Sequence, residues 1–177
     1  MQKSRGIEII TEPSAVPVRS LDLSGKRLEI FPESIRLPSN LEELDLDRNQ
    51  LSVLPESIGD LQTLKYLSLY DNLLDTLPDS VQRLSKLQTL NLSQNRFSSI
   101  PEFIGRFSDL RMLDLGHNQL QTLPDSIGDL KELRFLYLSN NQLAAIPDSF
   151  RKLENVTYLN ITDNELTSFP GQIGAMK

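Results

Sequence analysis

The sequence has 177 residues, a formal net charge of −6 at pH 7 and no cysteine. The acidic balance argues against a nucleic-acid partner, which would require a clustered basic face, and against binding to an anionic membrane surface. The lack of cysteine excludes disulfides, zinc thiolate sites and thiol catalysis. No apolar run approaches the ~18 residues that a membrane-spanning helix needs.

Residues 1–17 precede a repeated pattern that begins at Val18. The basic start of this segment leads into a short apolar stretch that Glu8 interrupts, so it does not read as a signal peptide. We expect residues 1–17 to lie across the first repeat as an N-terminal cap, with Ile7, Ile9 and Ile10 as candidate contacts.

From Val18 onwards, one template returns every 23 residues without insertion. The template reads LxxLxLxxNxLxxLPxxIxxL. A single repeat cannot bury its own leucines, whereas stacked neighbours build a continuous core. The sequence therefore predicts a single domain of seven stacked repeats, at residues 18–40, 41–63, 64–86, 87–109, 110–132, 133–155 and 156–177.

Each repeat is expected to begin with a short strand. Its LxL core, Leu44 and Leu46 in the second repeat, alternates apolar with polar residues as a half-buried strand does. Successive strands must be parallel because a return segment separates them. The Asn of the template is expected to turn inward, where its amide would satisfy backbone groups that no water reaches. These structural asparagines are Asn49, Asn72, Asn95, Asn118, Asn141 and Asn164.

The return segment of each repeat contains a proline, which an acidic residue follows in the first six repeats. Proline suits the first position of a helix because no N–H is needed there, and an acid suits the positive end of a helix. We therefore expect one turn of 3₁₀ or short α-helix after each strand. Because return segments are bulkier than strands about 4.8 Å apart, the stack should curve with its sheet on the concave face. The prolines are Pro32, Pro55, Pro78, Pro101, Pro124, Pro147 and Pro170.

The runs LPESIGDLQTLKYLSL (54–69) and LPDSIGDLKELRFLYL (123–138) resemble the leucine-rich-repeat family. The resemblance is to its 23-residue LPxxI subclass, found in cytoplasmic Ras-regulator scaffolds, plant intracellular Ras-group proteins and many bacterial proteins. It implies an α/β solenoid, a curved right-handed horseshoe with a parallel sheet on the concave face and short 3₁₀ or α turns on the convex face. The first repeat departs from the pattern, since Lys26 replaces the Asn and Pro38 replaces the last Leu.

Secreted members of this family commonly carry cysteine-rich caps at both ends, and this chain has no cysteine. The resemblance therefore implies a cytoplasmic location, with a secreted bacterial effector as the alternative.

Strand alternation places three columns of residues outward, on the exposed side of the sheet. All four tyrosines fall in these columns, whereas the phenylalanines other than Phe135 occupy inward template positions, with Phe103 as the exception. Exposed aromatic residues and Met are enriched in protein interfaces. The alternative is that tyrosine simply favours strands. The predicted partner-binding residues are Tyr66, Tyr70, Met112, Phe135, Tyr137 and Tyr158, together with Asp45 and Asp47.

The two aspartates belong to an acidic corner that Asp22 and Glu43 complete. This corner would attract a basic segment of a partner. A solvated polar face explains the same residues equally well.

The sequence contains little that indicates catalytic activity. The only histidine, His117, stands where a strand turns, and no Ser-His-Asp set can be built around it. Neither GxxxxGK[ST] nor GxGxxG occurs. We therefore expect no enzyme activity, no cofactor and no metal.

The last repeat ends without a polar covering segment, although solenoids need a polar outer face at each end. We expect this end either to self-associate or to continue into a longer protein. The exposed apolar residues would be Leu159, Ile161, Leu166, Phe169 and Ile173.

The predicted function is a protein-interaction scaffold that binds another protein on its concave face. The alternative is a targeting domain of a larger signalling enzyme or bacterial effector whose catalytic domain lies outside this chain. Binding of a carbohydrate or small ligand is a third reading, and a shallow sheet makes a poor enclosed pocket for it.

Overall fold

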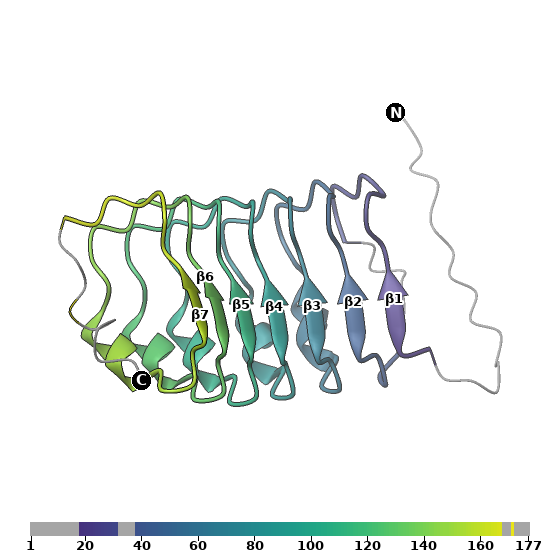
Figure 1. Cartoon of the computed structure of the whole chain (residues 1–177). Helices are drawn as coiled ribbons and strands as arrows, with labels where there is room; N and C mark the ends of the chain where they lie inside the picture. The colour runs from purple at the N-terminus through teal and green to yellow at the C-terminus, as the bar shows by residue number, and fades with distance from the viewer. Residues whose placement is uncertain (1–17, 32–37, 168–170, 172–177) are drawn as a thin grey trace.

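The computed structural model describes residues 18–31, 38–167 and 171. Seven short strands form one parallel sheet in which neighbours follow the chain order (Figure 1). The stack is a curved solenoid with this sheet on its concave face. The strands are β1 Ser20–Asp22, β2 Glu43–Asp45, β3 Tyr66–Ser68, β4 Thr89–Asn91, β5 Met112–Asp114, β6 Phe135–Tyr137 and β7 Tyr158–Asn160.

Each strand pairs with the next at an offset of one repeat, so Glu43 stands beside Tyr66 and Phe135 beside Tyr158. Residues at the same template position therefore form continuous rows across the sheet. The central leucine of every strand from β2 to β6 is fully buried. Leu21 of β1 and Leu159 of β7 are half-buried, because within the described part of the chain each terminal strand has a neighbouring strand on one side only.

The return segments of the second to sixth repeats fold into 3₁₀ helices on the convex side. The sequence predicts proline at the first position of each helix, and this prediction is wrong by one residue. Pro55 is the N-cap, with an extended backbone (φ −74°, ψ 152°), and the helix begins at Glu56. The carbonyl of Pro55 accepts the N–H of Ile58 at 3.1 Å, so proline starts the turn without being inside it. The helices are η1 Glu56–Asp60, η2 Asp79–Arg83, η3 Glu102–Arg106, η4 Asp125–Asp129 and η5 Asp148–Lys152.

Glycine and serine let most neighbouring 3₁₀ helices approach each other closely. A Cβ added at Gly59 would lie 2.2 Å from the carbonyl oxygen of Ser80, and one at Gly128 would lie 2.4 Å from that of Ser149. No side chain larger than glycine's hydrogen fits at these contacts. Gly105 meets Ser126 in the same way.

The exception lies between η2 and η3, where Gln82 takes the glycine position and Phe103 takes the serine position. Because Phe103 falls outside the inward template positions, the sequence predicts an exposed side chain, and this prediction is wrong. Its side chain is buried, with 9% relative exposure, and its ring centroid lies 6.4 Å from that of Phe107. Phe103 therefore fills the wider space between η2 and η3.

The template asparagines bridge adjacent repeats through their side-chain amides. The Oδ1 of Asn118 accepts the backbone N–H of Phe97 at 3.0 Å, and its Nδ2 donates to the carbonyls of Leu92 and Leu115 at 3.0 and 3.1 Å. The other template asparagines repeat this pattern, and all are buried except the half-buried Asn164.

The C-terminal side of the stack is less closed than its centre. Leu159, Ile161 and Leu166 are half-buried, whereas their counterparts one repeat earlier are fully buried. The predicted cap, with Ile7, Ile9 and Ile10, lies outside the described residues, as do Pro32, Phe169, Pro170 and Ile173. Within the described residues, no helix is long and apolar enough to cross a membrane.

Candidate interaction surface

Aromatic side chains gather on the concave face over β5, β6 and β7. Phe135 and Tyr158 pair in register and are 42% and 47% exposed. Tyr137 is half-buried, and its ring centroid lies 5.1 Å from that of Tyr158. Met112, also half-buried, pairs with Phe135 from β5. These four residues, Met112, Phe135, Tyr137 and Tyr158, are called the aromatic patch below.

Tyr66 and Tyr70 lie apart from the aromatic patch. Thr89 of β4 separates Tyr66 from Met112 in the same row. Both tyrosines are half-buried. Burial raises the pKa of the Tyr66 hydroxyl above its ordinary value, and the guanidinium carbon of Arg48 lies 5.9 Å from the centroid of the Tyr70 ring. A role for these two tyrosines in binding stays a prediction.

The two aspartates singled out from the sequence, Asp45 and Asp47, already make structural hydrogen bonds. Asp45 Oδ1 accepts the backbone N–H of Asp47 at 2.9 Å. Asp47 Oδ1 accepts the Ser68 hydroxyl and the backbone N–H of Tyr70 from the next repeat. Burial raises the pKa of the half-buried Asp47 carboxyl, with the Ser68 hydrogen bond acting in the opposite direction. Attraction of a basic partner by this corner stays a prediction.

The exposed part of the sheet is narrower than strand alternation predicts. Ser68, Ser93, Gly116 and Ser139 were placed in the outward columns, and all four are buried. Three of them follow the strands, where the chain begins to turn and the next repeat covers it. A Cβ added at Gly116, for example, would meet the carbonyl oxygen of Ser139 at 3.4 Å.

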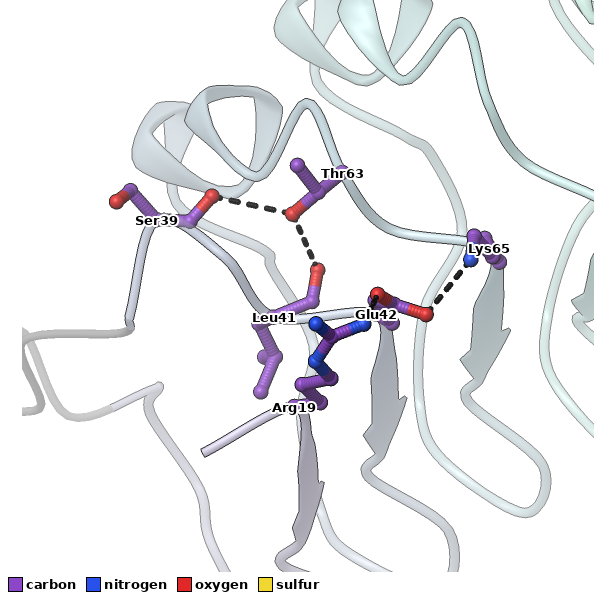
Figure 2. Close-up of polar contacts among 6 residues, drawn as sticks. All are labelled: Arg19, Ser39, Leu41, Glu42, Thr63 and Lys65. Carbon is purple, nitrogen blue, oxygen red and sulfur yellow. Dashed lines mark hydrogen bonds and ion pairs between the residues drawn. The ribbon is translucent and has the colours of Figure 1, made fainter. Parts of the chain in front are cut away.

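A further row of residues, directly before the strands, was missed by the sequence reasoning. In the N-terminal half of this row, Arg19 and Lys65 both contact the Glu42 carboxylate, at 2.6 and 2.7 Å (Figure 2). The hydrogen bond from Lys65 is the main reason that the pKa of the Glu42 carboxyl is lowered. Figure 2 also shows the Thr63 hydroxyl next to the Leu41 carbonyl, 2.7 Å away, so this hydrogen bond connects the end of the second repeat with its beginning.

The row continues through Gln88 to Arg111 and Arg134, both exposed, and ends at Thr157. Two-residue alternation gives no clue to this row, because its members precede the strands. The signal that could have revealed it is that the basic residues are spaced by multiples of the 23-residue repeat.

Two titratable residues in and after β5, Asp114 and His117, lie close to other groups of the chain. His117 is exposed, and its Nε2 lies 3.4 Å from Nδ2 of Asn140. Burial raises the pKa of the Asp114 carboxyl, and this carboxylate accepts the backbone N–H of Gly116 at 2.9 Å. The residues that the structure describes contain no group of three or more His, Cys, Asp or Glu that could hold a metal ion.

The solved structures that are similar to this chain include one from a bacterium and one from a plant. A leucine-rich-repeat protein of Leptospira interrogans is 32% identical, with a TM-score of 0.69 over 89% of this chain and 52% of that one. The leucine-rich-repeat ectodomain of the membrane receptor kinase GASSHO1/SCHENGEN3 from Arabidopsis thaliana, in complex with CASPARIAN STRIP INTEGRITY FACTOR 2, is 30% identical. Its TM-score is 0.68 over 84% of this chain and 22% of that one. The present chain thus spans about half of the first structure and about a fifth of the second.

Family comparison agrees with the geometry. A family model described as leucine rich repeat matches residues 39–97 and 98–143, and a second, for leucine-rich repeats in two copies, matches residues 131–171. No curated protein matches the chain. Leucine-rich-repeat proteins generally mediate protein–protein interactions and are typically non-catalytic binding scaffolds. With its seven-stranded parallel sheet, its buried leucines and these family matches, the chain belongs to the leucine-rich-repeat family.

Proposed function

We propose that this protein is an interaction scaffold that holds a partner protein against its concave face, centred on the aromatic patch. The observation that carries the proposal is the exposure of Phe135 and Tyr158 in adjacent strands. Contiguous exposed apolar area is characteristic of binding sites rather than of ordinary protein surface.

The aromatic patch is not needed to close the core. Leu136 lies between Phe135 and Tyr137 on the other face of β6 and is fully buried. A preference for strands explains why Phe135 can stand in β6 but not why its ring is exposed, because a phenyl ring lacks the hydroxyl that keeps an exposed tyrosine hydrated. Tyrosine also contributes contact area at low entropic cost, which favours binding surfaces.

The similarity to a receptor ectodomain solved with a bound factor supports a protein or peptide as the class of partner. A shallow sheet of this kind offers no enclosure for a small molecule. We further propose that the chain is not itself an enzyme, and that it acts in the cytoplasm, with a secreted bacterial effector as the alternative location. A reporter fused to the chain in its native host would test the location.

Affinity capture with the purified chain tests the proposed surface. Proteins retained by the wild type are identified by mass spectrometry and their dissociation constants are then measured. Changing Phe135→Ala and Tyr158→Ala together should weaken binding by about 2 kcal/mol or more, which is about 30-fold in Kd. The far-UV circular dichroism should stay unchanged, because neither side chain belongs to the leucine core.

The matched control is the pair Ile30→Ala and Val53→Ala. These side chains are 80% and 63% exposed, and they lie outside the sheet. The control should bind as the wild type does. A folded Phe135→Ala, Tyr158→Ala variant that binds as tightly as the wild type would place the site elsewhere.

A further inference from the structure

We propose that the partner segment held at the aromatic patch is acidic, and that Arg111 and Arg134 bind its carboxylates while an apolar side chain packs on Phe135 and Tyr158. This inference rests on the proposed function, since it names the chemistry of the segment that occupies the same surface.

The backbone fixes the two arginines beside the aromatic patch. The N–H of Arg134 donates to the carbonyl of Arg111 at 2.9 Å, so the two residues are neighbours on adjacent repeats. The same Arg111 carbonyl accepts the N–H of Phe135 at 3.0 Å, and the Arg134 carbonyl accepts the N–H of Tyr158 at 3.0 Å. Both arginines therefore stand at the border of the aromatic patch.

Within the described residues, neither guanidinium makes an ion pair or a hydrogen bond with another part of the chain. Asp109 and Glu132 stand two residues before the arginines and form no ion pair with them. Arg19 and Lys65 in the same row differ from the two arginines, because both form ion pairs with Glu42. The position between Lys65 and Arg111 is taken by Gln88, which carries no charge.

Two like charges on neighbouring strands repel each other, and this pair is exposed on a chain whose net charge is −6. A carboxylate placed between them would remove the repulsion. Guanidinium groups bind carboxylates through paired, charge-assisted hydrogen bonds. The aromatic patch would then supply most of the affinity and the arginines the selection of an acidic partner.

The charges on the rest of the sheet determine on which side of the sheet the acidic part of the bound segment lies. The outward positions of β1 and β2 carry Asp22, Glu43 and Asp45. Those of β6 and β7 carry no acidic residue. The acidic part of the partner is therefore repelled from the N-terminal end of the sheet and attracted to Arg111 and Arg134, which directly precede β5 and β6. Asp114 of β5 is half-buried, and its carboxylate accepts the backbone N–H of Gly116.

The test uses a displayed library of random peptides, about 12 residues long, selected on the folded wild-type chain. Peptides that bind are synthesised in two forms, with their Asp and Glu residues kept or replaced by Asn and Gln. Affinities are measured by fluorescence anisotropy for the wild type, for Arg111→Gln with Arg134→Gln, and for Phe135→Ala with Tyr158→Ala. Arg19→Gln with Lys65→Gln is the matched control, because it removes two positive charges that Glu42 already pairs.

The selected peptides are expected to contain both acidic and apolar residues. The Arg111→Gln, Arg134→Gln variant should bind them about tenfold or more weakly, and the amidated peptides should show no further loss on that variant. The Arg19→Gln, Lys65→Gln control should bind the acidic peptides as the wild type does.

Selected peptides with no excess of acidic residues, or undiminished binding by Arg111→Gln with Arg134→Gln, would overturn the inference. If Phe135→Ala with Tyr158→Ala still abolishes that binding, the proposed function stands without it. A selection that yields no peptide dependent on Phe135 and Tyr158 would count against both.

Discussion

Each template asparagine completes backbone hydrogen bonds that its repeat cannot complete in any other way. Asn118 connects the N–H of Phe97 with the carbonyls of Leu92 and Leu115, and all of these groups are shielded from water. The amide is suited to this task because it is donor and acceptor at once.

Replacing Asn118 by Ala should therefore destabilise the fold strongly. The buried backbone groups would lose their partners at about 1–3 kcal/mol each, so we expect a loss of about 3 kcal/mol or more in the free energy of unfolding. Urea denaturation measures this loss. The neighbouring Gln119→Ala, at an exposed position, should stay within about 0.5 kcal/mol of the wild type. A denaturation midpoint unchanged in Asn118→Ala would contradict the structural role.

The residue before each template asparagine adopts a left-handed backbone, which the sequence did not reveal. Arg48, Gln94 and His117 have φ values of 54°, 52° and 53°. Arg48 and Gln94 give no local signal for this backbone, whereas Asp71, Asn140 and Asp163 occupy the same position in other repeats and are of the types that favour it. The left-handed backbone could therefore have been predicted from the repeats that carry Asn or Asp here, but not from those that carry Arg or Gln.

The strands and turns follow from the repeated template, whereas some contacts between them depend on residues that depart from the template. The LxL spacing predicts all seven strands and their parallel order. The burial of Phe103 was missed, because its template position is occupied by serine in the flanking repeats. Only the joint occurrence of Gln82 and Phe103 indicates a wider gap between η2 and η3.

A double substitution tests whether Gln82 and Phe103 act together. Phe103→Ser alone should destabilise by about 3 kcal/mol, in the range seen when a buried ring is removed. Adding Gln82→Gly restores the glycine–serine contact found at Gly59 and Ser80, and should recover part of this loss. The free energies of unfolding of the two single variants and the double variant measure the coupling. Strictly additive losses would show that the two positions are independent.

The residues of the candidate surface could be predicted only in part, because their exposure and pairing depend on how the repeats are placed against one another. The sequence placed Phe135, Tyr137 and Tyr158 together, because a constant repeat sets their rows. It did not show that Ser68 and Ser93 are covered, since curvature and turns decide exposure. Nor did it distinguish the paired Arg19 from the unpaired Arg111 and Arg134, because pairing depends on which residue occupies the adjacent repeat.

At the scale of the whole molecule, stability in a solenoid is roughly a sum over neighbouring repeats. The last strand should therefore open first. The amide of Tyr158 should exchange with solvent faster than that of Met112, although both donate equivalent backbone hydrogen bonds, to Arg134 and Gln88. Leu159 is half-buried beside the first amide, whereas Leu113 is fully buried beside the second. Hydrogen-exchange mass spectrometry of the monomer measures the difference.

Equal protection of the two amides in a monomer would contradict this account of stability. Equal protection that arises only in a dimer would instead support self-association through the C-terminal side of the stack.

The partner is proposed to lie on the concave face over β5, β6 and β7. Chemical-shift mapping of the isotopically labelled chain, titrated with the captured partner, locates the bound surface. The largest shifts should fall on the backbone amides of Met112–Asp114, Phe135–Tyr137 and Tyr158–Asn160. Largest shifts on the 3₁₀ helices η1 to η5, with the strand amides unmoved, would contradict it.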